Sequence, residues 1–461
     1  MKSKKNFIPL SVPNLIGNEE KYLKNCIKSS FVSSVGEYVK KFEKEICSFL
    51  NVKYAISCNS GTAALHLALR VAGVKMNDEV IVPTMSFIAT ANSVKYVNAS
   101  PIFIDCDKFY NLDYEKTKSF ILNHTFLKNN SCFNKKTKKK ISALIVVHVF
   151  GNAANISGLI KLCKSRNIKI IEDAAGALGT KYLKGKLNNK YTGTIGDIGC
   201  ISFNGNKIIT SGGGGMIVTN NKMFAKKSLH LSTQANIDKH NYIHDEVGYN
   251  YRLTNIQAAV GLAQLEKIKF FIKKKKKIKK FYLIKLKNFK YFNYDKKPEY
   301  ASNNCWMLSI TLSKKLTKNK NKIIKELLKN SIETRSIWKP LHLQKPYRFY
   351  ETYKVSNSEK FFHTTLNLPS STNLNNLELA NVAQPQYLEQ FFNVVSNQDL
   401  ITGEPLGTNN FTNLKVDTSF ADKIVQTDDD LQMASWLFSN DKFNIVDSIE
   451  FNSDEYVKYK N

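Results

Sequence analysis

The stretch VKYAISCNSGTAALHLALRVAG, residues 52–73, predicts a strand, a short polar turn and an apolar helix. The same alternation continues to about residue 220. The other predicted strands are 78–83, 100–107, 142–151, 169–175, 200–203 and 215–220, and the other predicted helices are 88–98 and 156–167. Continuous apolar strands that alternate with helices are typical of a mainly parallel α/β sheet that is buried on both faces.

The segments around this region predict how the chain is divided. Polar, Lys-rich residues 123–140 are expected to form a solvated insertion loop, and residues 254–286 predict one long helix with an apolar stripe. The stripe consists of Ile268, Phe271, Ile278, Phe281 and Tyr282. We interpret this helix as a link between two domains, with a membrane-surface helix as the alternative. We therefore expect a large α/β domain (1–255), the linker helix with a smaller α+β domain (256–372), and an acidic appendage of unassigned role (373–461).

The net charge of +30 would suit a polyanionic partner such as nucleic acid, but its distribution argues against that. Only five of the 68 basic residues are arginine, the side chain that groove-reading proteins favour. The charge is also divided along the chain, with +39 over residues 1–372 and −9 over residues 373–461. We interpret the surplus as a chain-wide lysine bias and expect no nucleic-acid partner.

The eight cysteines show neither a CxxC pair nor the spacing of a zinc site, and no run approaches 18 apolar residues. The chain opens MKSKKNFIPLSVPN, without the apolar segment of a secretory signal. His240 and His244 have helical i,i+4 spacing, but HNYIH lacks the glutamate of a metalloprotease helix. We expect a cytoplasmic protein with reduced thiols, no membrane span and no metal.

Two segments place polar groups at predicted strand ends. In CNSGTAALHLALR, residues 58–70, Gly61 and Thr62 lie at the start of a helix, which suits a phosphate group, although Ser-Gly-Thr is also an ordinary helix cap. In IIEDAAGALGT, residues 170–180, Glu172 and Asp173 end an apolar strand. A carboxylate there can pair with a protonated ring nitrogen or simply cap the next helix.

A third segment, GDIGCISFNGNKIITSGGGGMIVTN, spans residues 196–220. Lys207 follows a predicted strand that ends near Ser202, and it precedes the four glycines Gly212–Gly215. One lysine among 63 is rarely catalytic, but a desolvated amine beside a cofactor can form a Schiff base with an aldehyde. A phosphate cradle, a strand-end aspartate and a buried lysine are together the parts of a pyridoxal 5'-phosphate (PLP) site.

With these motifs the chain resembles the DegT-type (DegT/StrS) nucleotide-sugar aminotransferases, whose fold is that of the fold-type I, aspartate-aminotransferase-like PLP enzymes. The resemblance runs from about Phe31 to Leu374. The matching segments are FVSSVGEYVKKFE, CNSGTAALHLAL, DEVIVPTMSFIATANSV, HVFGN, IEDAAGALGT, SFNGNKIITSGGGGMIVTN, GYNYRLTNIQAAVGLAQLE, RSIWKPLH and LNLPSSTNL. The SSVG opening and the NGNK…GGGG loop are most similar to the subgroup that acts on UDP-4-keto-6-deoxy-N-acetylglucosamine.

The resemblance implies a role for each matched residue. Lys207 would bond to the cofactor and move the proton during transfer, and Asp173 would pair with the ring nitrogen. The other implied cofactor contacts are those of Gly61, Thr62 and Ser202 with the phosphate, Phe87 with the ring face, and Asn250 with the phosphate of the neighbouring subunit's cofactor. The last contact implies a homodimer with shared active sites.

Some positions depart from the family pattern or leave two interpretations open. Gly176 stands where the family usually has Gln, Glu or His, which can contact the cofactor, and Ala153 follows HVFGN where Pro is common. Arg335 and Trp338, in RSIWKPLH, could face the sugar nucleotide, although a tryptophan is more often part of a core. These departures concern the fine tuning of the site.

The implied function is PLP-dependent transfer of an amino group from L-glutamate to C4 of a nucleotide-linked 4-keto-6-deoxy sugar. UDP-4-keto-6-deoxy-N-acetylglucosamine is the first candidate, as a precursor of surface-polysaccharide or glycan sugars. A non-catalytic regulator or basic-surface binding protein on the same fold is one alternative. A PLP-dependent sugar dehydratase is another, although Lys207 argues against it because the dehydrating relatives carry His at that position.

Overall fold

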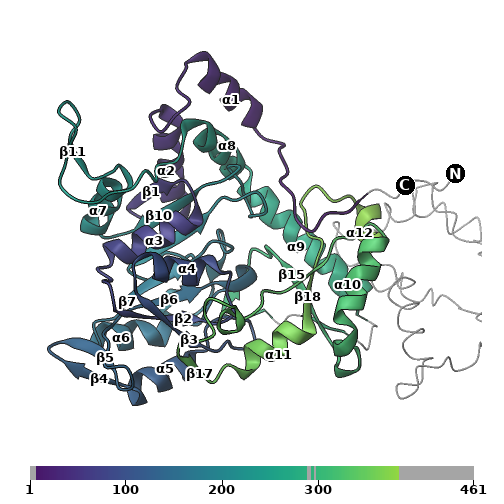
Figure 1. Ribbon diagram of the computed structural model, residues 1–461. Helices are drawn as coiled ribbons and strands as arrows, with labels where there is room; N and C mark the ends of the chain where they lie inside the picture. The colour runs from purple at the N-terminus through teal and green to yellow at the C-terminus, as the bar shows by residue number, and fades with distance from the viewer. Residues whose placement is uncertain (1–6, 288–291, 295–296, 384–461) are drawn as a thin grey trace, which may run out of the picture. The chain divides into compact units, whose positions relative to one another are not determined.

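An eight-stranded sheet lies at the centre of the protein (Figure 1). The computed structural model describes residues 7–287, 292–294 and 297–383. In spatial order the strands are β1 (Tyr54–Cys58), β10 (Gly215–Thr219), β9 (Ile198–Ser202), β7 (Lys169–Asp173), β6 (Ile141–Val147), β2 (Glu79–Pro83), β3 (Ser100–Ile104) and β17 (Thr352–Tyr353). Neighbours pair in parallel except at β10, which is antiparallel to β1 and β9. The predicted mainly parallel sheet and each of its predicted strands are confirmed.

Alternate side chains of the strands fill two layers of core, as the period of two along a strand requires. In β2, Val80 and Val82 belong to one hydrophobic cluster, and Ile81 belongs to the cluster on the opposite face. The first layer is covered by α3 (Gly61–Val71), α4 (Ala89–Tyr96) and α7 (Lys222–Ser232), and the second by α5 (Tyr114–Asn123) and α6 (Ser157–Ser165). Figure 1 shows α3 and α4 on one side of the strands and α5 and α6 on the other.

A second, antiparallel sheet follows in the chain. Its order is β13 (Phe292–Tyr294), β15 (Leu308–Leu312), β18 (Thr365–Leu368) and β16 (Arg335–Ser336).

The remaining helices are α1 (Glu19–Lys28), α2 (Glu37–Leu50), α8 (Asn255–Glu266), α9 (Ile268–Lys285), α10 (Lys320–Lys329), α11 (Ser356–Thr364) and α12 (Asn376–Val382). Short pairs are formed by β8 (Lys181–Tyr182) with β14 (Ala301–Ser302) and by β11 (Asn236–Asp238) with β12 (Ile243–His244). Single 3₁₀ turns occur at Val149–Gly151, Gly185–Leu187, Lys314–Asn319 and Leu341–Leu343.

The prediction of a solvated insertion loop at residues 123–140 is wrong. This segment contains a hairpin of β4 (Thr125–Lys128) and β5 (Ser131–Asn134). Cys132 and Asn134 are buried, and the Asn134 amide donates hydrogen bonds to Glu79 (2.9 Å) and Glu351 (2.6 Å). The lysines that suggested a solvated loop follow the hairpin, so they say little about the strands before them.

The predicted single helix at 254–286 is also wrong, because α8 and α9 meet at Lys267 as separate helices. Thr254 starts α8 with a capping box. Four of the five residues of the predicted apolar stripe, Ile268, Phe271, Ile278 and Tyr282, are buried, and Phe281 is half-buried. Because protein covers this stripe, the membrane-surface interpretation is not supported. Among the described residues, no helix combines the length and the apolar character needed to cross a bilayer.

The predicted appendage is described only at its start. Residues 373–383 include α12, which contacts α9. The rest of the appendage, from residue 384 onward, lies outside the described residues.

Candidate active site

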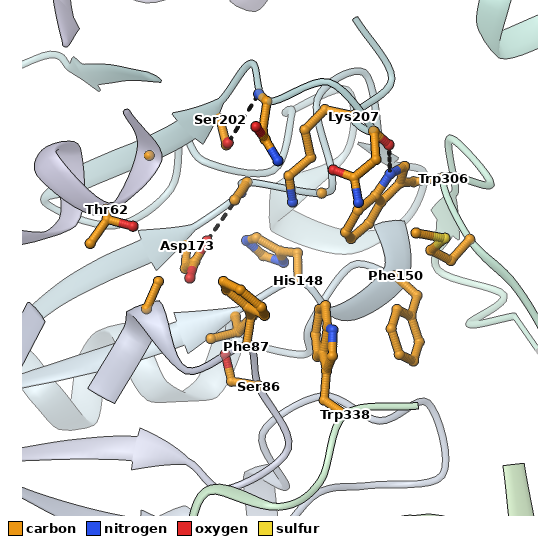
Figure 2. Close-up of a pocket in the computed structure, with 18 of the residues that line it drawn as sticks. Thr62, Ser86, Phe87, His148, Phe150, Asp173, Ser202, Lys207, Trp306 and Trp338 are labelled. Atoms are coloured by element: carbon orange, nitrogen blue, oxygen red, sulfur yellow. Dashed lines mark hydrogen bonds between the residues drawn. The ribbon is translucent and has the colours of Figure 1, made fainter. Parts of the chain in front are cut away.

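A cavity of about 460 Å³ opens where the chain leaves the carboxyl ends of β1, β2, β6, β7 and β9. Ligands bind at this edge in open α/β sheets, and the volume is typical of small-molecule sites. The sequence-predicted residues that line the cavity are Gly61, Thr62, Phe87, Asp173, Ser202 and Lys207. Residues from five separate strand ends and from the second sheet therefore meet at one place (Figure 2).

The N-terminus of α3 forms one end of the cavity, where Figure 2 shows Thr62 and Ser202. The Ser60 hydroxyl accepts the Ala63 N–H (3.0 Å), so the N–H groups of Gly61 and Thr62 have no partner inside the helix. A Cβ at Gly61 would lie 2.8 Å from the Cβ of Ser202, closer than two unbonded carbon atoms approach. Backbone N–H groups and two hydroxyls thus converge at a helix N-terminus, which is a suitable site for a phosphate group.

The two acidic residues at the end of β7 have different environments, because successive side chains of a strand face opposite sides. Asp173 lines the cavity, whereas Glu172 is fully buried. Glu172 accepts hydrogen bonds from His148 Nε2 (2.8 Å) and from the N–H groups of Gly193 (2.9 Å) and Gly196 (2.6 Å). Burial alone would raise the pKa of Glu172, but these hydrogen bonds outweigh it and lower the pKa. Glu172 therefore stabilises the loop at residues 193–196 through hydrogen bonds to its backbone. Asp173 is the carboxylate that a ligand in the cavity would contact.

The Asp173 carboxylate is fixed by two donors. Thr90 Oγ1 donates to Oδ2 (2.8 Å), and the Ala175 N–H donates to Oδ1 (3.1 Å). Thr90 is buried and lies 2.7 Å from the Ser86 hydroxyl. Sequence reasoning missed Thr90, although its segment was among the matched motifs, because nothing in the motif shows which polar side chain reaches β7.

Lys207 is the basic group at the centre of the cavity. Burial lowers the pKa of its amine to about 8, although the nearby Asp173 carboxylate acts in the opposite direction. Its Nζ lies 3.8 Å from the centre of the Trp306 ring. An amine with this pKa exists in both protonation states near neutral pH, which suits a group that moves protons.

Aromatic rings form one wall of the cavity, which runs from Phe87, beside Asp173, to Trp338 and Phe150 (Figure 2). Trp338 packs against Phe87, with ring centres 6.1 Å apart, and against Phe150, with ring centres 4.7 Å apart. Phe87 is nevertheless 57% exposed, so much of its ring is open to a ligand. Arg335 also lines the cavity and forms an ion pair with Glu333. Trp338 is thus at once packed among other rings and part of the cavity wall.

Trp306, for which no role was predicted, occupies the space beside Gly176. A Cβ at residue 176 would overlap Cε3 and Cζ3 of the Trp306 ring. Asn304 donates to the carbonyl groups of Gly176 (3.0 Å) and Leu178 (3.0 Å), which fixes the Trp306 segment on the loop after β7. The glycine at residue 176, which departs from the family pattern, therefore leaves space that the Trp306 indole ring fills.

Three residues considered from the sequence lie outside the cavity. Asn250 is exposed, and its carbonyl accepts a hydrogen bond from the Asn59 amide (3.3 Å). His240 and His244 are exposed at the β11–β12 hairpin, and His244 Nδ1 lies 2.8 Å from a backbone carbonyl. In the described part of the chain, the potential metal ligands that cluster are His230, Asp245 and Glu246, and Glu246 pairs with Lys227.

The residues present fit PLP. The α3 N-terminus provides phosphate donors in a cradle too narrow for a side chain at Gly61. Asp173 provides a fixed carboxylate for a ring nitrogen, and Lys207 provides an amine for the aldehyde. These three groups line the same cavity, in an arrangement that matches the three distinct functional groups of the cofactor.

Comparison with known proteins gives consistent results. The sequence model of the DegT/DnrJ/EryC1/StrS aminotransferase family matches residues 13–385. GDP-perosamine synthase of Escherichia coli O157:H7 is 37% identical over 82% of this chain and 97% of that protein. The putative pyridoxal phosphate-dependent aminotransferase EpsN of Bacillus subtilis (strain 168) is 36% identical over 82% of this chain and 94% of that protein. Helicobacter pylori PseC, an aminotransferase involved in the biosynthesis of pseudoaminic acid, superimposes with a TM-score of 0.73 at 27% identity, over 84% of this chain and 100% of that chain.

The family match covers most of the chain, including both sheets and every cavity residue except Leu10. They agree with the architecture, which is a mainly parallel α/β sheet with ligand groups at its carboxyl edge. The chain belongs to the DegT/DnrJ/EryC1/StrS family of PLP-dependent aminotransferases.

Proposed function

We propose that the protein transfers an amino group from L-glutamate to C4 of a nucleotide-linked 4-keto-6-deoxy sugar. The observation that carries this proposal is the convergence of Lys207, Asp173 and the α3 N-terminus on one cavity. Family membership supports amino transfer to a sugar as the reaction. The choice of C4 and of the sugar rests on the motif resemblance.

Bound PLP supplies an aldehyde that accepts the amino group and a ring that withdraws electrons from the reacting carbon. Gly61, Thr62 and Ser202 would hold its phosphate with backbone N–H and hydroxyl donors. The Asp173 carboxylate would keep the ring nitrogen protonated, because a close negative charge favours the cationic form. The Lys207 amine, with a pKa lowered by burial to about 8, would take a proton from the reacting carbon and return it.

The aromatic wall would receive the ring face of the cofactor and the sugar. Phe87 has the more exposed ring and would lie on the cofactor face. Trp338 and Arg335, on the second-sheet side, would meet the sugar nucleotide, since a guanidinium group suits the phosphates that link sugar and base. These two residues would contribute to substrate choice rather than to proton transfer.

Two nucleotides are candidates for the sugar carrier. The SSVG and NGNK…GGGG motifs favour UDP-4-keto-6-deoxy-N-acetylglucosamine. The similarity to GDP-perosamine synthase, over nearly the whole length of that protein, favours a GDP-linked sugar. The choice between them concerns the pocket for the base and leaves the chemistry at Lys207 unchanged.

The test supplies full-length protein with PLP and L-glutamate, and with either UDP-4-keto-6-deoxy-N-acetylglucosamine or a GDP-linked 4-keto-6-deoxyhexose. NMR of the product and the yield of 2-oxoglutarate are measured. A new amine at C4 with one 2-oxoglutarate per product is expected for one of the two sugars. Sugar dehydration without amine transfer would identify a dehydratase. Cofactor binding with no turnover of either sugar, together with salt-sensitive polyanion binding, would favour a binding protein.

We further propose a homodimer in which Asn250 reaches the cofactor phosphate of the partner subunit. Asn250 is exposed and does not line the cavity of its own chain. Val247, three positions before Asn250, is 78% exposed, and Phe31, whose carbonyl accepts a hydrogen bond from the Asn255 amide (2.7 Å), is 55% exposed. Exposed apolar side chains of this kind are typical of subunit contacts. An active site shared between two subunits would bury Phe31 and Val247, and it would bring Asn250 to the cofactor phosphate of the partner subunit.

A further inference from the structure

Trp306 links the two sheets at the point where Lys207 enters the cavity. It lies in the segment between β14 and β15, is only 2% exposed, and lines the cavity together with Lys207. We propose that Trp306 is a positioning residue for Lys207, whose ring, seated on Gly176, forms the wall that directs the lysine amine and shields it from water. The inference rests on the proposed role of Lys207 as the cofactor-binding lysine.

The position of the ring is determined by Gly176. Any side chain at residue 176 would overlap the six-membered part of the Trp306 indole. The glycine therefore admits the ring to a place beside the loop that follows Asp173, and the ring fills that place. The two residues act as one packed unit, although they come from different sheets.

The ring contacts the Lys207 segment in two ways. Its face lies 3.8 Å from Lys207 Nζ, measured from the ring centre, and its Nε1 donates a hydrogen bond to the carbonyl of Asn206 (2.6 Å). A cation over an indole face is attracted to it, and the hydrogen bond fixes the backbone one residue before the lysine. Figure 2 shows the Lys207 side chain extending beside the ring of Trp306. The indole thus constrains both ends of the lysine.

The Trp306 backbone is itself held from the other side. Its N–H donates to Asn304 Oδ1 (2.9 Å), and its carbonyl accepts from Lys275 Nζ (2.9 Å) and the Ser370 hydroxyl (3.2 Å). Lys275 lies on α9 and is 2% exposed. A ring anchored in this way has little freedom to turn, which is what a positioning wall requires.

The Trp306 wall should affect the pKa of Lys207 in one direction. The other charged or titratable groups that line this cavity or the small one adjoining it are Asp173, His148, Arg335 and Lys275. Asp173 and the indole face both favour the ammonium form of Lys207, yet burial outweighs them and lowers its pKa. Opening the wall to water should therefore make Lys207 easier to protonate.

The test measures how fast full-length protein, freed of its cofactor, takes up PLP across a pH series from about 6 to 10. The uncharged amine is the reactive form, so the wild-type rate should rise through a midpoint near 8. Trp306→Ala is expected to move this midpoint upward by about one pH unit, and Trp306→Phe should keep it near the wild-type value. In the loaded enzyme, Trp306→Ala should lower kcat about tenfold with a smaller change in KM for glutamate.

Gly176→Ala provides an independent test, because its methyl group would displace the ring. It should shift the uptake midpoint in the wild-type background and cause no further shift when Trp306 is already alanine. Phe120→Ala, a fully buried aromatic substitution in another core cluster, controls for lost stability and should leave the midpoint unchanged. An unchanged midpoint in Trp306→Ala, or a Gly176→Ala shift that persists without Trp306, would overturn the inference.

Lys207→Ala separates this inference from the proposed function. The covalent bond is the readout here, because the phosphate cradle and Asp173 can hold PLP without this lysine. If the wild type bonds covalently to PLP and Lys207→Ala does not, the role of Lys207 stands and the Trp306 variants test the wall alone. If both proteins bond to PLP equally, the proposed function fails first, and the positioning role of Trp306 fails with it.

Discussion

Thr90 and Asp173 lie 83 positions apart in the sequence, and the threonine Oγ1 donates a 2.8 Å hydrogen bond to the carboxylate Oδ2. The bond joins α4 to the end of β7, so the helix after β2 fixes the carboxylate that faces the cavity. A carboxylate acceptor with a buried hydroxyl donor is a strong pair, because the buried Thr90 hydroxyl has no water as an alternative partner. The orientation of Asp173 thus depends on the packing of the sheet.

Thr90→Val should weaken cofactor binding about tenfold, since it keeps the shape of the side chain and removes the donor to Asp173. The dissociation constant of PLP, measured by titration of the full-length chain, is the readout. Ser93→Ala is the matched control, because Ser93 is a buried hydroxyl of the same helix that donates to the Thr90 carbonyl (2.9 Å). Equal affinity in wild type and Thr90→Val would show that Asp173 does not need this donor.

Lys207→Ala should abolish the visible absorbance that arises from the bond between this lysine and the cofactor, and it should lower turnover by about a thousandfold or more, because no other amine replaces the proton carrier. Absorbance spectra and 2-oxoglutarate formation measure the two effects. Lys161→Ala, at an exposed position on α6, serves as the lysine control and should behave like wild type. A Lys207→Ala protein with full turnover would refute the assignment.

Lys275 should make stability depend on pH. Its amine is buried against a carbonyl and a hydroxyl, and burial lowers its pKa from 10.5 to about 7. Between these two values the unfolded chain binds more protons than the folded chain, so the unfolding free energy should rise with pH across this window. The contribution of Lys275 is on the order of 5 kcal/mol over the full window.

Urea unfolding of wild type and Lys275→Met across a pH series from about 7 to 10 measures this contribution. The difference between the two proteins is the readout, because Lys207 titrates with the same sign over part of the window. Lys276→Met, an exposed neighbour on α9, should follow the wild-type curve. Parallel curves for wild type and Lys275→Met would contradict the prediction.

Mixed dimers should reveal shared active sites. Lys207→Ala and Asn250→Ala are each expected to be nearly inactive alone, because every site in either dimer lacks one of the two groups. Hybrid dimers would contain one site with both groups intact, so mixing after reversible dissociation should restore part of the activity. Size-exclusion chromatography with light scattering confirms the assembly. A dimer without any rescue would place Asn250 outside the partner's site.

Much of the fold follows from local pattern. Apolar runs of strand length, separated by helical segments, predicted the strands of the central sheet apart from β17, and the Gly61–Thr62 turn predicted the start of α3. The order of the strands within the sheet was not predicted. Two segments were predicted wrongly, because their overall composition or periodicity masked the local signals of strand and helix ends. Lysines after the β4–β5 hairpin made residues 123–140 resemble a loop, and the continuous helical period of 254–286 concealed the break at Lys267.

The candidate site was predictable where a residue's role is fixed by its neighbours in sequence. Lys207 and Ser202 could be identified because they lie in one strand–loop–strand unit. The family resemblance assigned Asp173 rather than Glu172 to the cofactor. The structure adds the physical reason, because Asp173 lines the cavity and Glu172 is buried away from it.

The sequence by itself thus predicted the strands of the central sheet, the turn at Gly61–Thr62 and the candidate lysine Lys207, since strand period, helix capping and glycine turns are local properties. Only the tertiary structure decided that Thr90 holds Asp173 and that Trp306 fills the space beside Gly176. Trp306 and its hydrogen-bond acceptor Asn206 are 100 positions apart, and their contact depends on how the second sheet packs against the first. No periodicity within either segment encodes that packing, because it follows from the combined shape of both sheets.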